Sequence, residues 1–381
     1  MIRLFKISSD TTIYEWNKTL NAGADEILEM TVRTSADWGK STNESSRILI
    51  KPAWPINGTT EQYARYAFTS ASLRLFAANV EGAEDRSTKA EIFPLTSQWK
   101  EGTGKYFDNH NVQDAIGANW NFRSNESNGV EWPTPSAAAG HASSSTTAGY
   151  GGGTWYTGSN SGSVSSFIDD GPSYNSGELE STRYDLNIDI TTYLTHVSNS
   201  ALTNHGLIIK HQNESGSIAP PAIKYFSADT NTIYYPRVEH KVDDYSWSTS
   251  KAAIGTEQAT VYYKSNSGKY DRRQLVRFRP VVRETFPEAA YTTASVADTI
   301  KTFTATKACY AIVDEKTDEE IIGFDSTFTR ICADSEGMYF DVDMDSLEIG
   351  RVYKPVIRVA GRIGGTYDYE YFDNKDYFEV V

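Results

Sequence analysis

Apolar and polar residues alternate with a period of two along much of this chain. Ser72–Leu75 and Leu186–Ile190 place an apolar side chain at every second position, as a strand with one buried face does. Ser46–Ile50 and Leu207–Ile209 are short apolar runs, which suit central strands covered on both faces. No helical periodicity extends beyond about three turns. The pattern therefore predicts an all-β protein built from antiparallel sheets.

One stretch, YFSADTNTIYYPRVEHKVDDYSW at residues 225–247, gathers aromatic side chains with three Asp, one Glu and one His. Such a set could be an acid–base site between aromatic walls, or the closing strand of a domain. The alternation favours a strand over Tyr235–Val242, with a solvated face formed by Arg237, Glu239 and Lys241 and an opposite, inward face formed by Val238, His240 and Val242. We interpret the stretch as a structural strand at a domain seam.

The chain is expected to fold as two unlike β domains. The first covers residues 1–247 and is predicted to be a jelly-roll-like antiparallel sandwich. Small polar residues over 248–256 indicate a linker. Five or more strand-like segments then occupy 257–381, and their number and spacing suit an immunoglobulin-like sandwich.

A long insertion is expected in the first domain, over about residues 134–182. Its composition is mostly Ser, Gly, Ala and Thr, with few residues that could form a core. Burial of so few apolar groups does not offset the entropy lost on ordering. We expect a surface excursion anchored by Trp155 and Tyr156, ordered in part by a neighbouring subunit; the alternative is a flexible loop without a role.

Charge and composition narrow the range of partners. The 381 residues include 24 Tyr and 8 Trp, which favour strands, and 50 acidic against 36 basic residues give a net charge of −14. A negative averaged field repels phosphate backbones and anionic membranes, so neither nucleic acid nor a membrane is expected as a partner. The first residues lack the apolar run of a signal peptide, and synthesis in a cytoplasm without Sec export is expected.

The motifs that carry chemistry are incomplete throughout the chain. Trp38–Ser41 resembles the end of a phosphate-binding loop but lacks its first glycine, because Thr34 stands there. Cys309 and Cys332 belong to no CxxC motif, the six histidines form no HExxH motif, and no GxSxG sequence occurs. The sequence therefore predicts a protein that is not an enzyme and has no cofactor.

A run of acids, Asp341-Val342-Asp343-Met344-Asp345, resembles the start of a calcium-binding loop. The sixth position of such a loop requires Gly and the twelfth requires Glu, but Ser346 and Val352 occupy them. We expect the three Asp side chains on the solvated face of one strand and predict no metal site.

Several segments resemble, in order, the DNRLRE-type β-sandwich module. They include DTTIYEWNKTLNAGADEILEM, SRILIKPAW, LRLFAANVEG, EIFPLTSQWKEGTGKY and KYFSADTNTIYYPRVEHKVDD. The module has a strand similar to Arg47–Ile50, although Pro52 replaces its usual Phe, and a turn with a Ser-x-Trp-x-Glu-Gly pattern. That turn matches Ser97, Trp99, Glu101 and Gly102.

The resemblance is closer to virion structural proteins of tailed phages, in particular marine and cyanobacterial ones. Their Gly-Gly-x-Trp element matches Gly152–Trp155, and the segments YAIVDEKTDEEIIGF and DYFEVV resemble the Ig-like domain that follows it. The resemblance implies a multicopy, non-enzymatic component of the neck, collar or tail of the virion. Its partners would be other virion proteins and copies of itself, and it would be assembled in the host cytoplasm.

Glycan binding is the alternative, as in a capsid decoration or fibre protein, because DNRLRE-type sandwiches resemble carbohydrate-binding modules. Candidates for interface or glycan contact are the aromatic residues in loop-like contexts: Trp54, Trp120, Trp132, Trp155 and Tyr156. Large aromatic residues are more often core or interface anchors, so the two interpretations remain open. A polysaccharide depolymerase is disfavoured, because no β-helix repeat is present.

Overall fold

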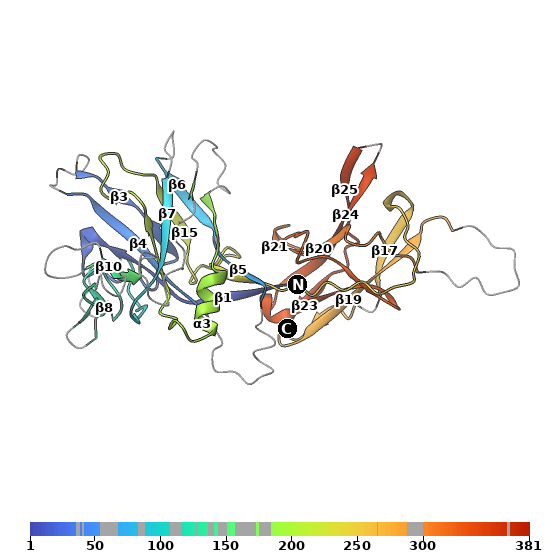
Figure 1. Cartoon of the computed structure of the whole chain (residues 1–381), viewed down its shortest axis with the longest axis horizontal. Helices are drawn as coiled ribbons and strands as arrows, with labels where there is room; N and C mark the ends of the chain where they lie inside the picture. The colour runs from blue at the N-terminus through green and yellow to red at the C-terminus, as the bar shows by residue number, and fades with distance from the viewer. Residues whose placement is uncertain are drawn as a thin grey trace, which may run out of the picture. The chain divides into compact units, whose positions relative to one another are not determined.

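The computed structural model of the chain describes residues 1–35, 39, 42–53, 68–82, 88–106, 116–126, 129–135, 141–143, 151–156, 173–174, 184–264, 266–287, 300–363 and 366–381. These residues form antiparallel sheets, and α3 (Thr191–Ser198) is the one α-helix described over its whole length (Figure 1). The described residues also form three short 3-10 turns: η1 (Glu15–Asn17), η4 (Thr256–Gln258) and η5 (Met344–Ser346). The predicted all-β sandwich class is confirmed.

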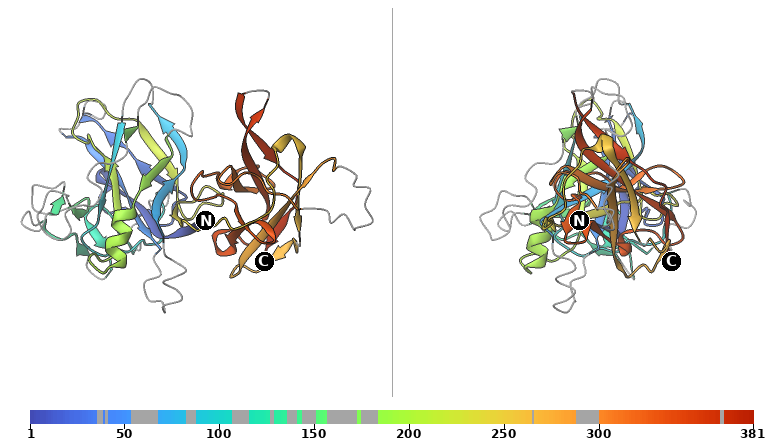
Figure 2. Two further views of the ribbon diagram at one scale, coloured as in Figure 1. Left: turned by 45° about the vertical axis from the view of Figure 1, so that its right-hand side comes forward. Right: turned by 90° about the vertical axis from the view of Figure 1, so that its right-hand side faces the viewer.

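The chain divides into two compact units. The N-terminal unit comprises Phe5–Tyr66 and Ser70–Glu239, and the C-terminal unit comprises Met1–Leu4, Ala67–Thr69 and His240–Val381. Both chain ends therefore belong to the C-terminal unit (Figure 2). The domain limits expected from the sequence, 1–247 and 257–381, place Met1–Leu4, Ala67–Thr69 and residues 240–247 in the first domain. In the structure these residues belong to the C-terminal unit.

Most strands of the N-terminal unit form one nine-stranded sheet. The order across it is β12 (Ser173–Tyr174), β7 (Thr88–Pro94), β14 (Leu207–His211), β4 (Glu44–Pro52), β1 (Ile2–Tyr14), β16 (Arg237–Lys241), β5 (Ser70–Leu75) and β13 (Leu186–Asp189), and β3 (Val32–Arg33) pairs with β4. Two short ribbons add to the unit: β8 (Phe122–Ser124) with β9 (Val130–Glu131), and β10 (His141–Ser143) with β11 (Thr154–Tyr156).

Burial along these strands follows the sequence pattern. In β13, Leu186 and Ile188 are buried while Asn187 and Asp189 are exposed, as alternation predicts. Strand β14 lies between β4 and β7 and is buried at all its positions, so both of its faces are covered. The predicted division into half-buried and central strands is confirmed for these segments.

A second, smaller sheet consists of β2 (Ile27–Met30), β15 (Ala222–Phe226) and β6 (Ala77–Glu81). Its β15 strand buries Ile223 and Tyr225 and leaves the alternate residues half-buried, so only one face of this sheet belongs to the core. Side chains of the large sheet hold it in place. The Glu29 N–H donates to Thr12 Oγ1 at 2.9 Å, and Ser46 Oγ donates to the Glu29 carbonyl at 2.9 Å.

The predicted solvated face of β16 is wrong. Arg237 and Glu239 are buried: β16 lies between β1 and β5 inside the large sheet, and the Arg237 guanidinium packs 4.9 Å from the Phe76 ring centroid. Their charges are balanced by ion pairs: Glu239 Oε1 accepts from Arg74 Nη1 at 3.0 Å and lies 3.6 Å from Arg237 Nε. The inward prediction for His240 is confirmed, since its ring is buried and packs on Phe68, and burial lowers its pKa to about 3.

The C-terminal unit is a sandwich of two sheets. One has the order β17 (Ala259–Lys264), β19 (Leu275–Glu284), β23 (Gly337–Asp343) and β22 (Cys332–Asp334). The other has the order β18 (Lys269–Tyr270), β26 (Phe378–Val380), β24 (Val352–Ile363), β20 (Ala308–Asp314) and β21 (Glu320–Ile322), with β25 (Thr366–Phe372) forming a hairpin with β24 (Figure 1).

Aromatic rings fill the space between the two sheets of the C-terminal unit. Tyr310 of β20 stacks on Phe340 of β23 with ring centroids 4.2 Å apart, and Phe278 of β19 stacks on the same ring at 5.5 Å. Phe378 of β26 approaches Phe278 at 5.1 Å. Contacts of this kind add about 0.5–1.5 kcal/mol per pair beyond burial of area. They explain why the unit has its own core.

The residues expected as a linker are part of the C-terminal unit. The Ser248 N–H donates to the Ala333 carbonyl at 2.7 Å, and the Ile254 N–H donates to the Thr302 carbonyl at 2.9 Å. At the other end of the chain, the Met1 ammonium donates to the Val242 carbonyl at 2.7 Å. The small polar residues of 248–256 are therefore not a free linker, because their backbone is hydrogen bonded to the C-terminal unit.

Candidate functional site

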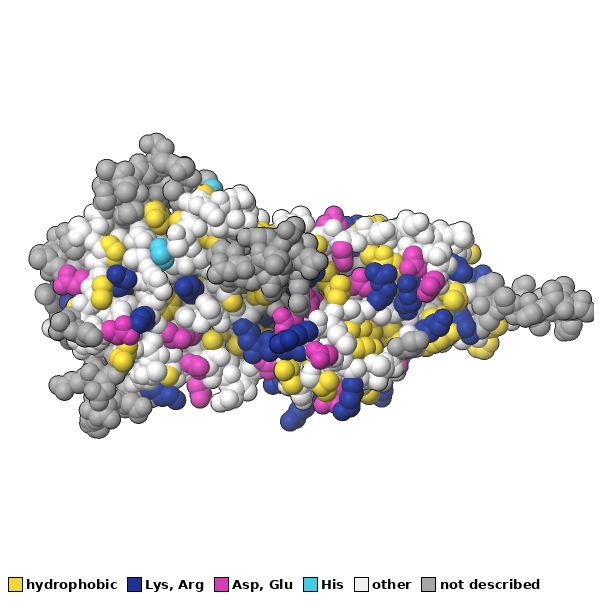
Figure 3. All heavy atoms as spheres, turned by 90° about the horizontal axis from the view of Figure 1, so that it is seen from below, with side chains coloured by type: hydrophobic (Ala, Val, Ile, Leu, Met, Phe, Trp, Pro, Cys, Tyr) yellow, Lys and Arg dark blue, Asp and Glu magenta, His cyan; other side chains and the backbone are white. Residues whose placement is uncertain are grey.

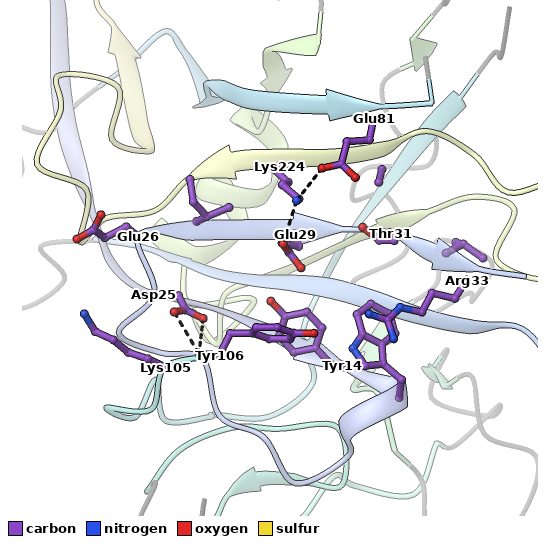
Figure 4. Close-up of a pocket in the computed structure, with 14 residues that line it drawn as sticks. Tyr14, Asp25, Glu26, Glu29, Thr31, Arg33, Glu81, Lys105, Tyr106 and Lys224 are labelled. Carbon is purple, nitrogen blue, oxygen red and sulfur yellow. Dashed lines mark hydrogen bonds and ion pairs between the residues drawn. The ribbon is translucent and has the colours of Figure 1, made fainter. Parts of the chain in front are cut away.

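A pocket of about 670 Å³ opens on the half-buried face of the small sheet in the N-terminal unit (Figure 4). We call it the tyrosine pocket. Its walls come from β1, η1, β2, β3, β6 and β15 and from two loops. The lining residues are Tyr14, Trp16, Asp25, Glu26, Ile27, Glu29, Thr31, Val32, Arg33, Glu81, Lys105, Tyr106, Ala222 and Lys224.

One wall of the tyrosine pocket is aromatic. The Tyr14 ring, at the end of β1, lies 5.1 Å from the Trp16 ring and 5.1 Å from the Tyr106 ring, tilted to both. The Arg33 guanidinium lies over the Trp16 ring at 3.8 Å from its centroid. Tyr14 is buried against Leu20, while Trp16 and Tyr106 are only half-buried and complete the wall. The Trp16 and Tyr106 rings are therefore held in place by packing against the buried Tyr14 and Leu20.

The opposite wall is polar and is built by strand pairing. Lys224 of β15 stands directly across from Glu29 of β2, so the antiparallel register brings their side chains together. Lys224 Nζ donates to Glu81 Oε1 at 2.9 Å and lies 3.7 Å from Glu29 Oε1. The hydrogen bond to Glu81 raises the pKa of Lys224, with Glu29 adding to the effect. This ammonium stays charged between two carboxylates.

A loop closes one end of the pocket. Both carboxylate oxygens of Asp25 accept the Tyr106 N–H, at 3.2 and 3.0 Å, and the Ala24 N–H donates to the Gly104 carbonyl at 3.0 Å. Figure 4 shows Asp25 and Lys105 at this end, with the Tyr14 and Tyr106 rings in the middle and Arg33 at the other end. The position of Tyr106 is thus set by Asp25.

The pocket combines nearly balanced charge with flat apolar surface. Four acids and three bases line it, and burial raises the pKa of Tyr14 well above its ordinary value, so its hydroxyl remains neutral. Such walls offer both hydrogen-bond donors and acceptors around rings. They suit the binding of a polar, ring-shaped molecule better than the transfer of a proton, because Lys224, which lies between Glu29 and Glu81, is held by two ion pairs.

Sequence reasoning missed these residues, although it used the segments that carry them for the resemblance. The closest local signal is a run of acids, Asp25, Glu26 and Glu29, soon after Trp16. Lys224 is far away along the chain and joins them only through the pairing of β15 with β2. No spacing within one segment could have identified the site.

The tryptophans predicted from the sequence belong to a different place, which we call the tryptophan cluster. Trp120, Trp132 and Trp155 are each at most 5% exposed and pack together with Trp99. The remaining members of the cluster are Ile13, Leu49, Leu95, Ala118 and Ile208. Trp54 lies outside the described residues, and Tyr156 is half-buried. Burial favours the core-anchor interpretation of these three rings, because a sugar could reach none of their faces.

Arg47 lies inside the tryptophan cluster. Its guanidinium is 4.8 Å from the Trp120 ring centroid and 5.2 Å from that of Trp155, and it pairs with Glu214 through hydrogen bonds of 2.8 and 2.6 Å. A third bond of 2.6 Å goes to the Gly152 carbonyl. Burial would raise the pKa of Glu214, but the Arg47 charge and hydrogen bonds hold it below its ordinary value.

Gly152 explains part of the Gly-Gly-x-Trp element. Its φ of +80° lies in the left-handed region, and a Cβ there would come within 2.6 Å of Arg47 Nη1 and 2.7 Å of the Trp120 ring. A side chain would therefore be strained and would displace the guanidinium. The element positions Trp155, whose neighbour Thr154 accepts the Thr96 N–H at 3.0 Å. Trp155 anchors the described part of the expected insertion.

The predicted Ser-x-Trp-x-Glu-Gly turn is also structural. Trp99 Nε1 donates to the His205 carbonyl at 2.9 Å, and Glu101 Oε1 accepts the Asp10 N–H at 2.7 Å. Asp10 is itself buried, and its Oδ2 accepts the Ala228 N–H at 2.8 Å. Burial raises the pKa of Asp10 to about 7, the Ala228 hydrogen bond opposes this, and the Glu101 and Asp229 charges add to it.

The expected solvated row of Asp341, Asp343 and Asp345 is wrong. Strand β23 ends at Asp343, which is buried and accepts the Asp345 N–H, so the chain turns there into η5. Each acid lies beside a different base: Asp341 by Arg277 at 2.8 Å, Asp343 by Arg3 at 3.4 Å and Asp345 by Arg272 at 2.8 Å. Among the described residues, no group of three or more His, Cys, Asp or Glu could hold a metal ion.

Cysteine and surface charge add little chemistry. Cys309 and Cys332 are buried free thiols, and burial raises the pKa of each. On the face that Figure 3 shows, acidic and basic side chains are interspersed rather than gathered by sign. In the part of the chain that the structure describes, no helix has the length and apolar character to cross a membrane.

Comparisons with known proteins leave the family open. No protein-family model matches the chain, and no curated protein matches it. The resemblance to DNRLRE-type and phage virion proteins therefore stays a prediction.

Proposed function

We propose that this chain is a non-enzymatic structural protein of a tailed-phage particle, present in several copies at the neck, collar or tail. Contacts of its β-sandwiches and loops would hold it there. Its partners would be other virion proteins and copies of itself, and assembly would take place in the host cytoplasm. The ordered resemblance along the sequence motivates the proposal.

One structural observation supports it above others: the residues that carry the resemblance are packed into a scaffold. Arg47, Trp99 and Trp155 meet in the tryptophan cluster, and Gly152 binds Arg47 through its carbonyl. Groups whose hydrogen bonds are met inside the core have no free side to act on a substrate. These residues build the sandwich, and since one fold can serve many functions, the assembly role itself comes from the resemblance.

The alternative is a capsid decoration or fibre protein that binds glycan. The buried tryptophans do not favour it, but the tyrosine pocket does, because half-buried rings and charged groups face an open hollow there. A host surface glycan would then be a partner in addition to virion proteins.

Mass spectrometry of gradient-purified particles tests the structural proposal. The chain should be present at a reproducible ratio to the major capsid protein, and should remain after washing at high salt, because an integral component is held by many contacts. The control is the same preparation from a lysate of a phage that lacks the gene. Absence of the chain from washed particles would contradict the proposal. Antibody labelling in electron micrographs then separates neck, collar or tail from capsid.

A further inference from the structure

The tyrosine pocket has the dimensions and walls of a small-molecule site. Its volume of about 670 Å³ falls within the range of about 300–1,000 Å³ that is usual for ligand pockets. Tyr14 is fixed by burial, and Tyr106 is fixed by the bonds of its N–H to Asp25, so the aromatic wall exists without a ligand. A pre-formed wall loses little entropy on binding.

The aromatic wall and the charged wall would contact different parts of one ligand. The half-buried Tyr106 ring offers apolar surface to the hollow, whereas the Arg33 guanidinium already lies over the Trp16 ring. Opposite them, Glu29 and Glu81 offer acceptors and Lys224 offers a donor. A ligand that fits both walls has an apolar face and a set of hydroxyl groups, each of which can donate and accept.

Charge narrows the choice further. Lys224 is already neutralised by Glu29 and Glu81, and the Arg33 guanidinium lies on the Trp16 ring. The whole lining holds four acids against three bases, Lys105 included, so an anionic ligand would meet a net negative surface. A purely apolar ligand would remove water from these partly exposed charged groups without replacing its hydrogen bonds, which is costly.

We infer that the tyrosine pocket binds an uncharged saccharide, with a sugar ring against Tyr106 and its hydroxyls hydrogen bonded to Glu29, Glu81 and Lys224. This inference rests on the glycan-binding alternative above and names its site and ligand class. It does not depend on where in a particle the chain lies, so it can fail while the structural proposal holds, and the reverse.

Calorimetric titration of the purified full chain tests it. The probes are neutral oligosaccharides of glucose, galactose and N-acetylglucosamine, with oligogalacturonate and inorganic phosphate for comparison. We expect saturable binding of at least one neutral probe and weaker or no binding of the two anions. No binding of any neutral probe at millimolar concentration, or a preference for an anion, would overturn the inference.

Two substitutions locate the site. Glu29→Gln and Glu81→Gln each replace a charged acceptor by a neutral one of the same shape, and each should weaken binding of the neutral probe by about tenfold. Glu81 is 57% exposed, so its substitution leaves the fold intact even if that of Glu29 does not. Circular dichroism checks folding of both variants.

The matched control is Glu131→Gln, an exposed glutamate on β9 that does not line the pocket. Its affinity should equal that of the unsubstituted chain. If Glu81→Gln binds as tightly as Glu131→Gln does, the saccharide lies elsewhere and the assignment to the tyrosine pocket is wrong.

Discussion

The tryptophan cluster and the tyrosine pocket are made of the same kinds of residue but differ in what covers them. In each, an arginine lies over a tryptophan ring: Arg47 at 4.8 Å from Trp120, and Arg33 at 3.8 Å from Trp16. In each, a cation is paired with glutamate. The Arg47 side chain is only 1% exposed, whereas that of Lys224 in the pocket is 30% exposed.

This difference in cover assigns the two regions different roles. Inside the cluster, Arg47 donates hydrogen bonds to Glu214 and to the Gly152 carbonyl, and Glu214 balances its charge. Inside the pocket, rings and charges face a hollow. The same composition therefore stabilises the fold in one place and offers a surface to a ligand in the other, and mutation should separate the two.

Arg47→Ala should have the largest effect. It leaves Glu214 without its partner and a void between two tryptophan rings, and loss of one member of a buried pair costs about 3–5 kcal/mol. Chemical denaturation measures the free energy of unfolding. The matched substitution in the pocket, Arg33→Ala, should cost under about 1 kcal/mol, because Arg33 is half-buried and solvent replaces it. Equal losses would remove the distinction between the regions.

Trp155→Ala should have an effect of similar or slightly smaller size. Removal of a buried tryptophan costs about 3–5 kcal/mol, part of it from the cavity left behind. The neighbouring Tyr156 is half-buried, and Tyr156→Ala should cost about 1 kcal/mol. Thermal unfolding of both variants compares the two anchors predicted from the sequence. A larger loss for Tyr156→Ala would reverse the assignment of the anchor.

Asp10 and Glu214 should give stability an opposite dependence on pH. The pKa of Asp10 is raised by burial to about 7, so between about pH 4 and 7 the folded chain holds a proton that the unfolded chain releases. The free energy of unfolding should fall as pH rises through this window, by up to about 1.4 kcal/mol per unit. The lowered pKa of Glu214 adds stability at higher pH. This stability is lost only as the pH falls below the ordinary pKa of a glutamate.

Asp10→Asn isolates the first contribution. The amide oxygen can still accept the Ala228 N–H, but nothing titrates at this position. Denaturation midpoints measured from pH 4 to 7 should become flatter than those of the unsubstituted chain. An unchanged slope would show that Asp10 is not the group responsible.

Lys224→Met should have the smallest effect on stability. The lysine is partly exposed and its two ion pairs are screened by water, so loss of both should cost under about 1 kcal/mol. A loss as large as that of Arg47→Ala would mean that the polar wall is part of the core. Urea denaturation of the two variants side by side makes the comparison.

The sequence by itself determined the elements and much of the core. Alternation of Leu186 and Ile188 with Asn187 and Asp189 predicts the strand and its buried side, because period-two patterning is a property of one segment. The all-β class, the central strands and the inward His240 follow from the same local signal.

The tertiary structure decided what covers each face and which distant residues meet. The sequence pattern predicted that Arg237 and Glu239 are exposed to solvent. In the structure β16 lies between β1 and β5, and both side chains are buried. Trp155 read as a loop residue and is in the core, while Lys224 reaches Glu29 only through the register of β15 with β2. Periodicity acts over neighbours in the chain, whereas cover of a face and closure of a pocket depend on pairing between strands far apart in it.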